Sequence, residues 1–168
     1  DGAISLISNK LDLNKFMTDV PSQSSSAPLS VIAVPERVRL KIDAQVKELT
    51  YTNLSLRDAN GSLDIRDHEV AINDFVTKIL GGTLGFKGLY NTEDLSKPVF
   101  SIKLDMNKIK YGDAFTTFDM MKKVAPIAEY LDGFFNTSLV MKGVIGQNMM
   151  SVLNTLDASG LIETLNGN

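Results

Sequence analysis

The sequence has no cysteine and only one histidine, and both absences narrow its possible chemistry. Without cysteine the chain forms no disulfide, no cysteine zinc site and no catalytic thiol. Because His68 is the only histidine, a histidine metal site cannot be assembled, and a catalytic triad would depend on this one residue. His68 stands between two strand-like segments, where we predict a solvated turn.

Excess positive charge and long apolar runs are also missing. The 17 Lys and Arg against 20 Asp and Glu give a formal charge of −3. Nucleic-acid binding depends on a basic surface, so we expect no nucleic-acid partner. No apolar run is long enough to predict a membrane helix or a signal peptide. We therefore expect a segment of a longer protein, with any signal or anchor outside it.

Carboxylates are plentiful, but they alternate with apolar residues or stand in turns. A glycosidase needs two of them across a cleft, and a hydrolase of that kind is kept only as an alternative.

The glycine-rich stretch 81–88 lacks the Gly-Lys-Ser/Thr order of a phosphate-binding loop. Glycine at alternate strand positions instead predicts strong curvature or a close packing neighbour. We expect no enzyme activity, catalytic residue, metal site or cofactor.

Composition and patterning predict one domain over residues 1–168. The chain is 43% hydrophobic and 22% charged, as in ordinary globular proteins. A Ser/Pro-rich segment, residues 21–34, is expected to be a flexible surface loop. The 20 residues before it are too few for a domain of their own.

Alternation of apolar and polar residues predicts strands over 3–8, 38–46, 100–106, 135–141 and 161–165. Residues 54–67 alternate on both sides of Asn60-Gly61, which predicts a hairpin with a type I′ turn at that dipeptide. Strand follows strand without a helical crossover, so we expect an antiparallel sheet.

Helical spacing predicts a helix over residues 113–131, capped by Asp113 and interrupted at Pro126, and a second over 148–156. One further helical turn within 11–20 would have Asp12 as its cap. The predicted fold class is α+β and mainly β. It consists of a twisted, curved antiparallel sheet with two or three helices packed on or beside its apolar face.

The predicted helices are long enough to cover much of that face but not all of it. An uncovered apolar face marks a binding site for a partner or a lipid, whereas a fully covered face is ordinary core. Alternation places seven residues on one face as groove candidates: Leu40, Ile42, Leu63, Ile65, Ile102, Leu104 and Met106.

Several phrases, in order along nearly the whole chain, resemble the C-terminal region of the AsmA-like family of bacterial envelope proteins. The strand that follows Pro35 and ends in LTY (49–51) is one of them. The others are LDLNKFM (11–17), GGTLGFKGLYNT (81–92), PVFSIKLDM (98–106), VAPIA (124–128), GFF (133–135) and LDASG (156–160). Residues 21–28 depart from that pattern.

This resemblance implies a periplasmic module without catalytic residues, in a parent protein anchored in the inner membrane. Its partners would be phospholipid acyl chains, bound in an apolar β-groove and passed toward the outer membrane. Helices could plug the groove in this segment. The alternative is a structural module that docks other envelope proteins during outer-membrane assembly.

Overall fold

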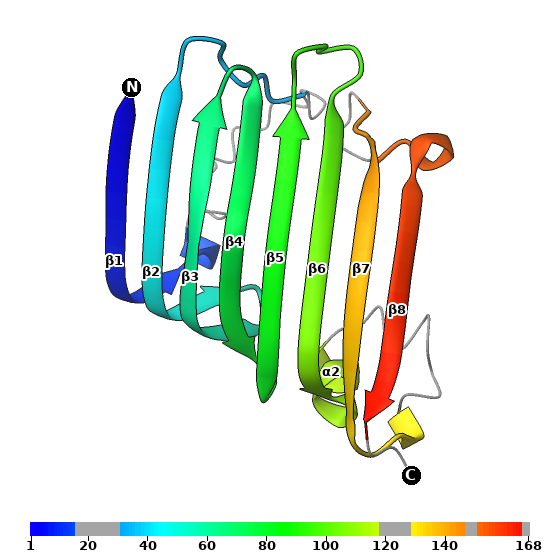
Figure 1. Cartoon of the computed structure of the whole chain (residues 1–168). Helices are drawn as coiled ribbons and strands as arrows, with labels where there is room; N and C mark the ends of the chain where they lie inside the picture. Colours follow the sequence, from blue (N-terminus) through cyan, green and yellow to red (C-terminus); the bar gives the residue numbers. More distant parts are fainter. Residues whose placement is uncertain (16–30, 118–128, 147–150, 166–168) are drawn as a thin grey trace, which may run out of the picture.

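The computed structural model describes residues 1–15, 31–117, 129–146 and 151–165. One eight-stranded sheet, with its strands in sequence order, makes up most of the described chain (Figure 1). The strands are β1 (Gly2–Asp12), β2 (Arg39–Tyr51), β3 (Leu54–Arg66), β4 (Glu69–Ile79), β5 (Gly82–Asn91), β6 (Val99–Lys110), β7 (Phe134–Val144) and β8 (Asp157–Leu165). The mainly β prediction is confirmed.

Strands β2 to β8 pair in antiparallel fashion, as predicted, but β1 pairs with β2 in parallel. The prediction of a wholly antiparallel sheet is therefore wrong at this edge. The physical reason is the connection, residues 13–38, which is long enough to return along the sheet before β2 begins.

The predicted turn at Asn60-Gly61 is also wrong, because β3 runs through both residues without interruption. Gly61 pairs with Ala44 of β2, and a Cβ on it would lie 2.9 Å from the Cα of Phe75. Close approach therefore accounts for this glycine. The left-handed turns lie elsewhere, at Thr52, at Asp67-His68 and at Leu80-Gly81, so the prediction of a turn at His68 is confirmed.

Three strand residues with positive φ bend the sheet: Asp58 (50°), Asp74 (47°) and Lys108 (54°). Each lies at or beside a shift in pairing register or an interruption of the ladder, as in a β-bulge. Figure 1 shows the lower parts of β1 to β4 curving. We call this end of the sheet, which carries the helix, the helix end, and the opposite end the loop end.

Helix α2 (Tyr111–Thr117) is the one α-helix whose bounds fall within the described residues. It begins two residues before the predicted cap, Asp113, and residues 118–128 of the predicted helix lie outside the described residues. The expectation of two or three helices is not supported. For the short turn after β1, the expected cap contact forms, since the Asn14 N–H donates to Asp12 Oδ1 (3.1 Å).

The predicted helix over 148–156 is wrong in its described part. Ser151 bridges Ile145, and the Val152 N–H donates to the Val144 carbonyl, so this stretch continues β pairing. Only η2 (Leu153–Thr155), a 3₁₀ turn, follows. Residues 148–150 lie outside the described residues.

The buried core lies at the helix end. Tyr111 of α2 stacks against Phe135 of β7, with ring centroids 4.8 Å apart. Its hydroxyl is 2.9 Å from Thr164 Oγ1 of β8, which ties the helix to the last strand. We call the following set the core cluster: Val46, Leu49, Leu56, Ala59, Ile79, Ile109, Tyr111, Ala114 and Phe135.

Candidate functional site

One face of the sheet carries an apolar row that crosses every strand. Residues opposite one another in adjacent strands share a face. The pairing registers therefore join one residue from each of the eight strands. In strand order the row is Ile4, Ile42, Leu63, Ile72, Gly88, Ile102, Met141 and Ala158. We call this side the apolar face.

All seven groove candidates lie on the apolar face. Leu40 pairs with Ile65, and Ile42 pairs with Leu63, across β2 and β3. The other three candidates, Ile102, Leu104 and Met106, belong to β6, which is separated from β3 by β4 and β5. Each of the seven side chains is partly exposed and none is buried. The structure thus places them in two groups on one face, with β4 and β5 between them. Met106, the candidate nearest the helix end, packs against the core cluster.

Phenylalanine side chains lie close to three glycines of this face. A Cβ on Gly88 would lie 3.0 Å from the ring of Phe86, and a Cβ on Gly143 would lie 3.2 Å from the ring of Phe100. Phe75 lies against Gly61 in the same way. These three phenylalanines were missing from the candidate set. Cross-strand pairing of glycine with an aromatic residue could have signalled Phe100, the register partner of Gly143. It could not have signalled Phe86, which lies two residues from Gly88 in the same strand.

The opposite face is charged. Ion pairs such as Lys41–Asp43 (3.6 Å), Lys87–Asp74 (2.7 Å) and Lys103–Asp105 (3.4 Å) lie on it. A hydrogen bond from Ser138 (2.6 Å), together with Lys103, holds the pKa of Asp105 below its ordinary value. Exposed pairs of this kind add little stability, but they give the two faces opposite character.

At the loop end, the segment before β2 crosses the sheet. The Val34 N–H donates to Thr92 Oγ1 (2.9 Å), and the Val34 carbonyl lies 3.0 Å from His68 Nδ1. Tyr90, which pairs with Phe100 on the apolar face, donates from its hydroxyl to the Ile32 carbonyl (3.1 Å). Burial raises the pKa of Tyr90.

The expected flexible loop, residues 21–34, is described only in its last four residues, and these include buried Val34. Residues 21–30 lie outside the described residues. The part that the structure describes is therefore an anchored segment at the loop end of the apolar face.

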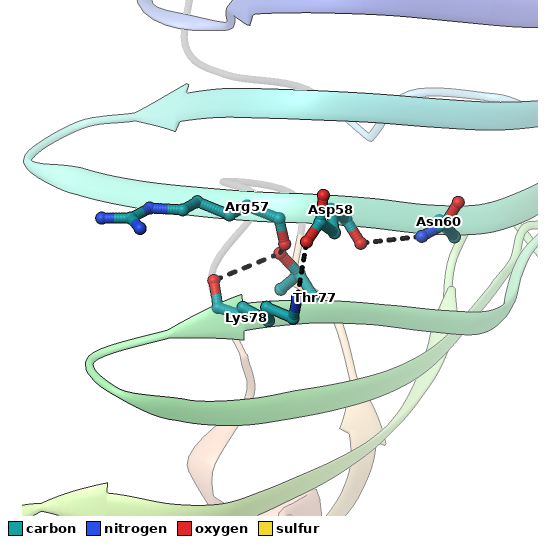
Figure 2. Close-up of polar contacts among 5 residues, drawn as sticks. All are labelled: Arg57, Asp58, Asn60, Thr77 and Lys78. Carbon is teal, nitrogen blue, oxygen red and sulfur yellow. Dashed lines mark hydrogen bonds and ion pairs between the residues drawn. The ribbon is translucent and has the colours of Figure 1, made fainter.

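A polar cluster stiffens the bend in β3 (Figure 2). The Lys78 ammonium lies 2.7 Å from Asp58 Oδ2, and Asn60 Nδ2 donates to the Asp58 carbonyl (2.7 Å). Thr77, which is 1% exposed, donates to the Arg57 carbonyl (2.9 Å). Cross-strand contacts thus hold the left-handed backbone at Asp58.

Lys78→Gln should raise the pKa of Asp58. The hydrogen bond and charge of Lys78 are the main cause that lowers this pKa, with Arg57 and Lys47 adding to the effect. A lowered carboxyl pKa stabilises the fold above the pKa of the unfolded chain, and that contribution is lost as the pH falls through the folded pKa. A carbon-detected NMR titration of Asp58 measures the shift. Lys142→Gln, whose ion pair is with Asp157, should leave the pKa of Asp58 unchanged.

Among the described residues, the buried polar side chains are two threonines, Thr77 and Thr92, and no buried carboxylate occurs. The same residues contain no group of three or more His, Cys, Asp or Glu that could hold a metal ion. Within the described ranges, no helix has the length and apolar character needed to span a bilayer.

Comparison of the chain with protein-family models, with curated proteins and with solved structures finds no match. The functional argument therefore depends on the two faces of the sheet and on the geometry at its ends.

Proposed function

We propose that the chain is a non-enzymatic lipid-binding module of a larger envelope protein, in which the apolar face holds phospholipid acyl chains. The resemblance of the sequence to the AsmA-like family supports a periplasmic location and passage of lipid toward the outer membrane. The observation that carries the proposal is the apolar row across all eight strands, with its candidate side chains partly exposed.

The layering of the described residues supports this proposal. Helix α2 packs over the helix end, and the segment with Val34 crosses the loop end. Between them, the described residues place no helix or strand over the middle of the apolar face. Eight strands about 4.8 Å apart span roughly 34 Å, and covering apolar surface stabilises by about 25 cal/mol per Å². Acyl chains would supply that cover.

Site-specific photocrosslinking in cells tests the proposal, with the probe at Ile102 or Leu104 of the full-length parent protein. We expect adducts of lipid mass at both positions, because their side chains lie on the apolar face. A probe at Lys103 is the matched control, since this residue lies between them in β6 and faces the charged side. It should give no lipid adduct.

Two results would contradict lipid binding. Protein adducts at Ile102 and Leu104 would show that another chain covers the apolar face. Absence of any adduct at both positions would show that these side chains are ordinary core in the parent protein.

A second candidate function, docking of another envelope protein, is favoured by the sheet edges. Among the described strands, β1 and β8 each have a single neighbour in the sheet, and a strand edge can pair with an added strand. Large apolar side chains are exposed there, including Ile7 (76%) and Leu161 (70%). Probes at these two positions should capture a saturable protein partner if docking is the function.

A further inference from the structure

A pocket of about 750 Å³ opens at the helix end, away from the middle of the apolar face. Its walls come from the tip of the β2–β3 hairpin, the tip of the β4–β5 hairpin, the bulge in β6 and the last residue of α2. Asn53 Nδ2 donates to the Thr117 carbonyl (3.2 Å), which fastens one wall to another. This volume is within the range of small-molecule sites, about 300–1,000 Å³.

The pocket forms because β3 and β4 separate near their ends. Their pairing stops at Arg57 and Lys78, although both strands continue beyond these residues. Gly82 closes the far side. Its backbone lies so near the Lys108 carbonyl that an added Cβ would be 2.6 Å from that oxygen.

Among the described residues that line the pocket, the charged ones are three cations: Arg57, Lys78 and Lys108. Lys78 is neutralised by Asp58, which is not part of the lining. Neither Arg57 nor Lys108 forms an ion pair with any described residue, although Glu48 is the register partner of Arg57 on β2. In Figure 2 the guanidinium of Arg57 extends away from Asp58. Within the part of the chain that the structure describes, these two cations therefore have no ion-pair partner.

The pocket also has an apolar wall, formed by Leu54, Ile79 and Leu80. Ile79 is 3% exposed and belongs to the core cluster, so this wall is firmly held. Amide and hydroxyl groups of Asn53, Asn107 and Thr83 supply further polar atoms. A ligand that fits both sets of residues combines an anionic head with an apolar body.

We infer that this pocket binds an organic phosphate, with the phosphate between Arg57 and Lys108 and the apolar body against Leu54 and Leu80. Guanidinium and ammonium groups are the side chains that proteins use for phosphate. The head of a phospholipid and a soluble phosphomonoester share this chemistry. The site requires no lipid on the apolar face, so it stands independently of the proposed function.

The test is an NMR titration of the whole 168-residue chain, with phenyl phosphate as the probe. We expect shifts at the amides of Gly81 and Gly82, which lie in the pocket, and none at Gly88 and Gly143 on the apolar face. Inorganic phosphate should bind about tenfold more weakly, because it has nothing to place against the apolar wall. Equal affinity for the two probes would contradict an organic ligand.

The double variant Arg57→Gln, Lys108→Asn should weaken phenyl phosphate binding about tenfold. Asparagine is used at 108 because φ is 54° there, a conformation that asparagine tolerates. The matched control, Lys103→Gln with Lys142→Gln, removes the same charge from the ion-paired face and should bind like the parent chain. Unchanged binding in the double variant would overturn the site.

Dioctanoyl phosphatidate identifies the source of the phosphate. Binding at Gly81 and Gly82 at least tenfold tighter than phenyl phosphate would assign the pocket to a lipid head, and similar binding would assign it to soluble phosphomonoesters. Shifts only at Gly88 and Gly143 would reject the pocket while supporting lipid on the apolar face. Shifts only at Gly81 and Gly82 with phosphatidate would support the pocket and contradict lipid binding on the apolar face.

Discussion

Gly82→Ala should lower the free energy of unfolding by about 3 kcal/mol, a large effect for one methyl group. An added Cβ would lie 2.6 Å from the Lys108 carbonyl oxygen and would also collide with the Asn107 carbonyl oxygen. Both obstacles are backbone atoms of the β6 bulge, so no side-chain rotation relieves the clash. Urea denaturation followed by far-UV circular dichroism measures the loss.

Gly85→Ala is the matched control in the same strand. Its Cβ would lie 3.8 Å from the nearest atoms of Asp105, an ordinary van der Waals contact. We expect the denaturation midpoint to change by less than the equivalent of about 0.5 kcal/mol. Equal stability of the two variants would mean that the β6 bulge moves aside readily and that Gly82 is not a packing requirement.

The glycine-rich stretch illustrates how far the sequence could predict this fold. Alternate glycines predicted curvature or a close neighbour, and Gly82 has a close neighbour. The identity of that neighbour depends on β6, which follows later in the chain, so local pattern could not supply it. The predicted turn at Asn60-Gly61 is wrong for a related reason. That dipeptide favours a type I′ turn locally, but pairing with β2 and packing against Phe75 hold it in β3.

The direction of β1 could not be predicted, because alternation gives the faces of a strand and not its orientation.

The seven groove candidates share one face because a period of two fixes sides within each strand, and the register then aligns the strands. Phe75 was missed because the bulge at Asp74 changes which residues face the apolar side. The pocket depends on the separation of β3 and β4 beyond the Arg57–Lys78 pair, which no local pattern encodes.

Ile109→Ala should cost about 3 kcal/mol of stability. Ile109 is 1% exposed and sits in the core cluster, one residue beyond the bulge at Lys108 and two before Tyr111 of α2. Removing its side chain leaves a cavity beneath the helix, where close packing limits collapse of the surroundings. Thermal and urea denaturation should both show the loss.

Ile162→Ala removes the same atoms from β8, where the side chain is 69% exposed, and should change stability by less than about 0.5 kcal/mol. Comparing the two variants distinguishes apolar residues of the buried core, such as Ile109, from apolar residues exposed at the sheet edge, such as Ile162. If both variants lost several kcal/mol, Ile162 would have to be covered in solution, which would favour a partner strand at the β8 edge. If neither did, α2 would not be packed on a firm core, and the walls of the adjacent pocket would not be held in place.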